Sequence, residues 1–133
     1  MRHVKYLVGA CLIRMPASLK IIEHYLVLVT LANGSRRWFY VIEKTRTGPR
    51  CREITHAEKS WIVEHRVPYK DLLPVLMRLR VALSWTGYNG LLDNCEQFGR
   101  FIIEGKHYSS QVRRATVGVA CLATLAFLEP SQD

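Results

Sequence analysis

The chain has few cysteines, and none are paired at a spacing typical of metal or redox sites. Its four cysteines are Cys11, Cys51, Cys95 and Cys121. Such wide spacing excludes the disulfide framework of small secreted proteins, and no C-x-x-C motif is present. A zinc site built from Cys51, His56, His65 and Cys95 would fit no ordinary ligand pattern. We therefore expect reduced cysteines, a cytoplasmic location, no metal and no other cofactor.

Long apolar runs are also missing. Residues 6–13 are apolar, but Arg14 interrupts them, which predicts no cleaved signal peptide. The last apolar run, from Ala115 to Leu128, has 14 residues, fewer than the roughly 17–25 that span a bilayer. We favour a packed or peripheral helix for this run, with membrane association as the alternative.

Acidic residues are scarce relative to basic ones. The 133 residues include 19 Lys and Arg against 11 Asp and Glu, a net charge of +8. Apolar residues make up 49%, so the composition is that of a globular protein, and no linker or repeat divides a single domain spanning 1–133. The excess of bases favours phosphate-bearing partners, namely non-specific RNA or an anionic membrane surface. The candidate basic surface comprises Arg36, Arg37, Arg46, Arg50, Arg52, Arg113 and Arg114.

The first half of the chain is rich in residues that favour strands. We expect strands at 4–15, 24–31 and 36–43. Asn33-Gly34 between the last two is the preferred centre of a two-residue type I′ hairpin. In that register Val29 faces Trp38, Val27 faces Tyr40 and His24 faces Glu43. Because directly opposed side chains are neighbours, the hairpin predicts a histidine–carboxylate pair.

The second half reads mainly as helix. Residues 44–53 are expected to form a basic loop, and Thr55 to Glu58 matches a capping box for a short helix to about His65. Apolar residues recur at helical spacing between Leu72 and Leu83, with Pro74 in the first turn, where proline is tolerated. Asp93 or Asn94 can cap a helix from Cys95 to Glu104 that ends at Gly105. The expected fold class is therefore α+β.

Cys95 and His24 are the residues that could carry chemistry. A cysteine at the start of a helix lies near the positive end of the helix dipole, which favours the nucleophilic thiolate. A histidine held by Glu43 could take the thiol proton, as in a Cys–His–acid triad. From the residues alone, Cys95 could equally be a small buried hydrophobe and His24 a satisfied core histidine.

Two segments resemble the signature boxes of a known superfamily. The segment DNCEQFGRFIIEGKHYSSQVRR contains Asn94-Cys95-Glu96-x-Phe98 and resembles the NC box of proteins related to lecithin:retinol acyltransferase. Upstream, Glu23-His24-Tyr25 followed by LVLV is similar to their H-box. The two boxes occur in the order of that superfamily, histidine before cysteine. The chain thus resembles the H-box/NC proteins, and most of all their small picornaviral 2A branch.

The resemblance implies a permuted papain-type fold, with the cysteine-bearing helix packed on an antiparallel sheet that carries the histidine. It also implies acyl-thioester chemistry on Cys95, with a phospholipid as acyl donor. Two positions depart from the cellular members: Glu43 stands where they carry a second histidine, and Gln97 replaces a common histidine. We expect the change at Gln97 to affect only the periphery.

Three functions remain open at this point. The preferred one is a viral nonstructural protein that supports replication in the host cytoplasm, in part at intracellular membranes. It would act through contacts with host or viral proteins, RNA or membranes, with a reduced or lost acyltransferase site. The second is an active thiol phospholipase/acyltransferase, and the third an electrostatic RNA-binding module. The approach of His24 to Cys95 separates the first two, because catalysis requires hydrogen-bond reach.

Overall fold

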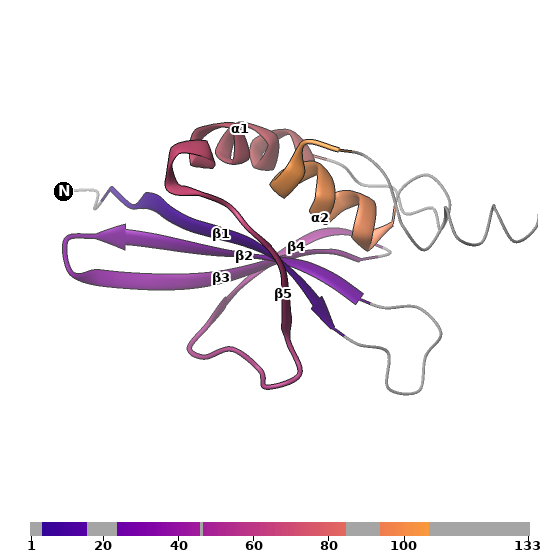
Figure 1. Ribbon diagram of the computed structural model, residues 1–133, viewed down its shortest axis with the longest axis horizontal. Helices are drawn as coiled ribbons and strands as arrows, with labels where there is room; N and C mark the ends of the chain where they lie inside the picture. Colours follow the sequence, from indigo (N-terminus) through magenta and orange to yellow (C-terminus); the bar gives the residue numbers. More distant parts are fainter. Residues whose placement is uncertain (1–3, 16–23, 46, 85–93, 107–133) are drawn as a thin grey trace, which may run out of the picture.

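The computed structural model describes residues 4–15, 24–45, 47–84 and 94–106. Five strands form one antiparallel sheet in the order β4-β3-β2-β1-β5. They are β1 (Tyr6–Met15), β2 (His24–Asn33), β3 (Arg36–Thr45), β4 (Gly48–Ile54) and β5 (Ile62–Arg66). A short 3₁₀ turn, η1 (Tyr69–Asp71), leads into α1 (Leu72–Ala82), and α2 (Cys95–Glu104) follows. Both helices lie on the same side of the sheet (Figure 1). The expected α+β class with an antiparallel sheet is confirmed.

The main core lies between this sheet face and the helices. Side chains alternate along a strand, so Leu12 and Val27 point toward the helices and are fully buried there. Val75 from α1 and Ile102 from α2 meet them and are also fully buried. A Cβ at Gly99 would lie only 2.6 Å from Leu12 Cδ1. The absence of a side chain at Gly99 therefore lets α2 approach the sheet closely.

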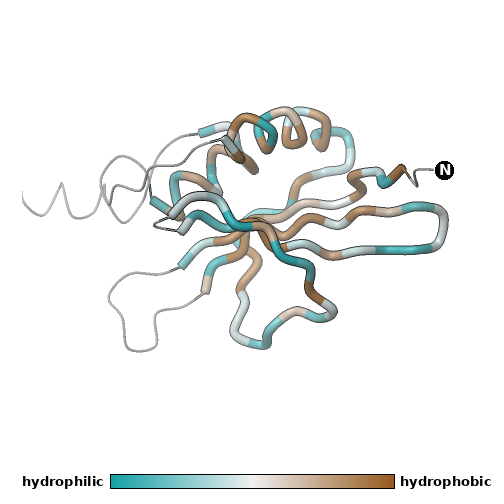
Figure 2. Tube along the Cα trace, turned by 180° about the vertical axis from the view of Figure 1, so that it is seen from behind, coloured by the Kyte–Doolittle hydropathy of each residue, from teal (hydrophilic) through white to brown (hydrophobic). Residues whose placement is uncertain are grey.

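A second, smaller core lies on the opposite sheet face. Its buried members are Cys11, Ile13, Leu26 and Val41. Trp61, from the connection between β4 and β5, packs against them. The central parts of these strands are apolar, as the hydropathy colouring shows (Figure 2). The central strands therefore bury apolar side chains on both faces of the sheet, which stabilises this small fold.

The β2–β3 hairpin forms, but in a different register from the predicted one. Asn33 pairs with Arg36, Val29 with Tyr40 and Val27 with Ile42, so the predicted partners of the two valines were wrong by two residues. The turn is centred on Gly34-Ser35, and Gly34 has a φ of 59°. A positive φ at the first central residue only is typical of a type II′ turn, which favours glycine there.

Residues 44–65 were predicted wrongly. The expected loop at 44–53 contains β4, which pairs with β3 from Thr45↔Gly48 to Phe39↔Ile54. Pro49 is compatible with this position because β4 is an edge strand. The expected helix from Thr55 to His65 is a connection followed by β5, which pairs with the free edge of β1. Strand pairing between residues about fifty positions apart overrides the local capping signal.

The other two helix predictions are confirmed. The amphipathic pattern between Leu72 and Leu83 corresponds to α1, with Pro74 in its first turn. The helix predicted from Cys95 to Glu104 is α2, with Asn94 at its N-cap and Gly105 in the left-handed conformation after its last residue. The apolar run from Ala115 to Leu128 lies outside the described residues.

Candidate active site

Cys95 is the first residue of α2, and a complete capping box fixes this end of the helix. The Asn94 side chain accepts a hydrogen bond from the backbone N–H of Gln97 at 2.9 Å, and Gln97 Oε1 accepts one from the Asn94 N–H at 3.0 Å. Both residues are buried. The expectation that Gln97 affects only the periphery was wrong, because it helps to hold the turn that carries Cys95.

His24 and Glu43 meet where the sheet divides. Nε2 of His24 lies 2.8 Å from Oε2 of Glu43. Among the described residues, the β2–β3 ladder ends at Val27↔Ile42. However, β2 stays paired with β1 as far as Met15↔His24, and β3 with β4 as far as Thr45↔Gly48. The hydrogen bond between the side chains thus links two diverging pairs of strands (Figure 1).

The pKa of His24 is raised from 6.5 to about 9, and the largest cause is a hydrogen bond with the side chain of Cys95. Burial opposes the shift, whereas the hydrogen bond to Glu43 and the charges of Cys95 and Glu43 add to it. The three predicted catalytic residues therefore come together, with His24 between the thiol and the carboxylate.

The two flanking groups are more buried than the histidine. Cys95 is 5% exposed, the Glu43 side chain 12% and the His24 side chain 40%. Nε of Arg52 on β4 lies 3.8 Å from the other carboxylate oxygen of Glu43. Glu43 is thus held between a cation and the imidazole, which keeps it oriented toward His24.

The remaining NC-box and H-box residues support the helix. Glu96 is fully buried, and its Oε2 accepts a 2.7 Å hydrogen bond from Arg100 one turn later. Arg100 also bonds Glu104 at 2.9 Å and Glu64 of β5 at 3.2 Å, and it lies over the ring of Tyr25. Burial disfavours the charge of Arg100, but these carboxylates outweigh it and raise its pKa. Phe98 is buried in the main core.

Sequence reasoning missed Arg100 and Glu64. The spacing of Glu96, Arg100 and Glu104, four residues apart on one helix, was the available signal for Arg100. Glu64 comes from a segment that was expected to be helical, so its contact with Arg100 depended on the position of β5.

The predicted basic residues do not all fall in one place. Arg36 and Arg37 begin β3, whereas Arg50 and Arg52 lie on β4. At the hairpin end, Nζ of Lys5 lies 4.4 Å from the centre of the Trp38 ring, and Arg36 lies 5.1 Å from the same ring. Arg46, Arg113 and Arg114 lie outside the described residues.

The four residues considered for zinc do not assemble into a site. Cys51 is exposed on β4, whereas Cys95 is buried at the start of α2. Within the described ranges, no group of three or more histidine, cysteine or acidic side chains could hold a metal ion. Among the described cysteines, Cys11, Cys51 and Cys95 form no disulfide with one another. In the same ranges, no helix is long and apolar enough to cross a membrane.

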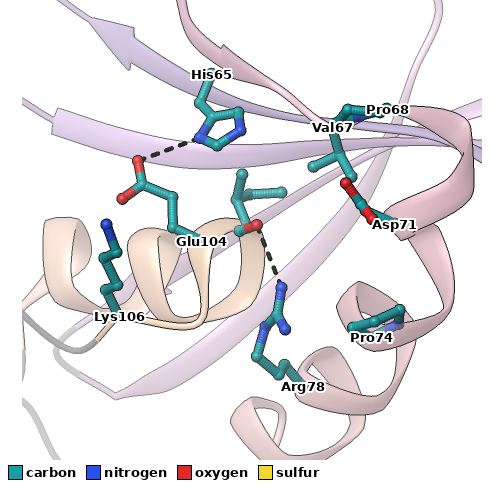
Figure 3. Close-up of a pocket in the computed structure, with 9 residues that line it drawn as sticks. His65, Val67, Pro68, Asp71, Pro74, Arg78, Glu104 and Lys106 are labelled. Carbon is teal, nitrogen blue, oxygen red and sulfur yellow. Dashed lines mark hydrogen bonds and ion pairs between the residues drawn. The ribbon is translucent and has the colours of Figure 1, made fainter.

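A hollow of about 570 Å³ lies apart from the triad, between the start of α1 and the end of α2 (Figure 3). Arg78 donates to the carbonyls of Ile102 and Ile103 at 2.9 and 3.2 Å, so it satisfies the C-terminal end of α2. His65 Nδ1 lies 3.4 Å from Glu104. These polar groups serve the packing of α1, α2 and β5 against one another.

Comparison with known proteins gives no relative: no family model, no curated protein and no solved structure matches the chain.

Proposed function

We propose that the protein is a thiol acyl-transfer enzyme of the H-box/NC type, with Cys95 as nucleophile, His24 as base and Glu43 as the residue that orients His24. One observation carries this proposal: Nε2 of His24 lies 2.8 Å from Glu43, and a hydrogen bond with the side chain of Cys95 is the largest cause that raises the pKa of the same ring. The sequence alone favoured a reduced or lost site. The assembled triad favours the active alternative, because Glu43 supplies the third member at the position where cellular members carry a second histidine.

The reaction would proceed in two steps. The reacting state is the one in which His24 holds the proton of Cys95, as its raised pKa favours, and the sulfur attacks the carbonyl carbon of an ester. The carbon–oxygen bond to the alcohol breaks, the alcohol oxygen takes the proton from His24, and an acyl-thioester remains on Cys95. His24 then takes a proton from water or an amine, which attacks the thioester. The thiolate leaves and recovers a proton from His24, so that the acid or amide is released.

The position of Cys95 suits the charge that develops in this reaction. It lies in the first turn of α2, where the helix dipole is positive. An oxyanion forming on the attacked carbonyl beside the sulfur would be stabilised by that end of the helix. Since Nε2 of His24 bonds Glu43, Nδ1 is the ring nitrogen left to exchange a proton with the sulfur.

We further propose that the fold is a permuted papain-type fold and that the acyl donor is a phospholipid. The antiparallel sheet with the Cys95 helix packed on the strand that carries His24 supports the first part. The second part rests on the resemblance of the H-box and NC box. Placement in the picornaviral 2A branch, with action in the host cytoplasm or at its membranes, belongs to the same proposal.

The test is intact-protein mass spectrometry after incubation with a short-chain phosphatidylcholine. We expect an acyl-sized mass increase in the wild type and in Cys51→Ala, the matched control that removes an exposed thiol. We expect none in Cys95→Ala. Absence of the adduct in the wild type, together with alkylation of Cys95 by iodoacetamide no faster than that of Cys51, would contradict an active site.

A second candidate function, non-specific RNA binding, is favoured by the hairpin end. There Lys5 and Arg36 lie over the ring of Trp38, and the next base, Arg37, is exposed and donates to the carbonyls of Gly34 and Arg36. Such binding must weaken steeply with salt, and replacing Arg36 and Arg37 with glutamine should reduce the salt slope by about two. The salt slope is measured by filter binding to a single-stranded RNA at several salt concentrations between about 50 and 200 mM, the range over which such binding weakens steeply. A slope unchanged by the double substitution contradicts this function.

A further inference from the structure

Helix α1 is apolar on two sides, and only one of them faces the core. Leu72, Val75, Leu79 and Ala82 are buried against the sheet and α2. On the other side, Leu73 is 68% exposed, Met77 58% and Val81 52%. These three residues are spaced by four, so they lie along one line on the helix. We call this line the α1 ridge.

The α1 ridge is unusual for a surface helix. A helix of a globular protein normally presents polar residues to solvent, and one that is apolar all round is normally buried. Contiguous exposed apolar surface rimmed by polar groups marks an interaction site. The rim here is formed by Tyr69, which is 78% exposed, and by the exposed bases Lys70 and Arg80.

We propose that the α1 ridge docks on an anionic membrane surface. Leu73, Met77 and Val81 would enter the boundary between headgroups and acyl chains, as the apolar face of an interfacial helix does. Lys70 and Arg80 would remain among the anionic headgroups, and Tyr69 has the amphipathic ring typical of the membrane interface. This binding adds a docking surface to the membrane location named in the proposed function, and it requires no chemistry at Cys95.

The charges favour a bilayer over two other occupants. Asp71 is the only acidic residue between 69 and 84, against three bases. A second copy bound through the same ridge would bring Lys70 and Arg80 of both copies into one interface, where their like charges repel. The apolar run 115–128 contains no acidic residue that could pair with those bases. Anionic headgroups supply the complementary charge.

Vesicle co-sedimentation of the full chain tests the proposal. The probes are vesicles of phosphatidylcholine with phosphatidylserine at about 7:3, and vesicles of phosphatidylcholine alone. We expect replacement of Leu73, Met77 and Val81 by Gln, Gln and Thr to weaken binding to both at least tenfold, since three buried apolar side chains are lost. The double variant Lys70→Gln, Arg80→Gln should lose only the extra affinity for vesicles that contain phosphatidylserine, by about fivefold for each charge removed.

Matched controls keep the result specific. Val4, Ile62 and Val63 are exposed apolar residues outside α1, and their replacement by threonine should leave binding unchanged. Cys95→Ala should bind like the wild type, which separates docking from acyl transfer. Equal binding of the α1 variant and the wild type would overturn the proposal. It would also be overturned if vesicle binding survived in the α1 variant but were lost when Leu122, Leu125 and Leu128 are replaced by glutamine. A third contradicting result would be a wild type that binds no vesicles but forms a dimer, with the dimer lost in the α1 variant.

Discussion

Nε2 of His24 lies 2.8 Å from Oε2 of Glu43, although the two residues are not opposed in the β2–β3 ladder. The observed register differs by two residues from the predicted one, which had placed His24 directly opposite Glu43. Because side chains alternate with a period of two, a shift of two residues keeps both side chains on the same sheet face, whereas a shift of one would separate them. The pair therefore forms across diverging strands, and the side chains themselves hold it together.

The pKa of His24 should depend more on Cys95 than on Glu43. It is raised to about 9, and the hydrogen bond to Cys95 is the largest contribution. We expect Cys95→Ala to lower this pKa markedly and Glu43→Gln to lower it by less. An NMR titration of the His24 ring protons measures both variants. A larger drop in Glu43→Gln than in Cys95→Ala would contradict the arrangement.

The charge of His24 should make folding stability depend on pH. Its pKa is higher in the folded protein, about 9, than the ordinary value of 6.5. The stabilising contribution is therefore complete below pH 6.5 and is lost as the pH rises toward 9. Urea unfolding at several pH values across this window measures the slope. His24→Gln removes the titrating group, so the free energy of unfolding of this variant should fall less steeply with pH than that of the wild type. Identical slopes in the two proteins would refute the contribution of His24.

Asn94 should stabilise the helix that carries Cys95. Its side chain accepts the N–H of Gln97, so Asn94→Ala should reduce the free energy of unfolding by about 1 kcal/mol. Asp71, the N-cap of α1, makes no side-chain capping bond and offers a matched control. Asp71→Ala should cost only a few tenths of a kcal/mol, because no capping bond is lost. Equal losses in the two variants, measured by chemical denaturation, would argue against the capping box.

The buried pair of Glu96 and Arg100 should be costly to break from one side. Arg100→Met leaves the fully buried carboxylate of Glu96 without its closest cation, which should destabilise the protein by about 3–5 kcal/mol. Arg14, whose bond to Glu64 is partly exposed, is the control, with an expected loss of about 0–1 kcal/mol. Adding Glu96→Gln to Arg100→Met should restore part of the stability. Failure of the second substitution to restore any would show that packing, not charge, dominates.

The sequence determined those features that depend on residues close together in the chain. Asn94 and Gly105 define the two ends of α2, because a cap and a left-handed residue act within one turn of the helix. The helical spacing of the apolar residues between Leu72 and Leu83 predicted α1 in the same way. The alternation of strand residues was enough to place His24 and Glu43 on a common face, even though the exact partners were wrong.

Tertiary structure decided which segments became neighbours. The signals at Thr55 to Glu58 favoured a helix locally, yet Ile62 to Arg66 pairs with β1, whose edge needed a hydrogen-bonding partner. The turn moved by one residue because Gly34 adopts a positive φ at its first position, while Asn33 donates to the carbonyl of Val4.

The triad shows both contributions together. The sequence identified Cys95, His24 and Glu43 by residue type, by helix position and by face. The approach of the His24 ring to Cys95 required α2 to pack on the sheet through Gly99 and Leu12, which are 87 positions apart in the chain. Such contacts depend on the packing of the whole core, and no pattern within a single segment encodes them.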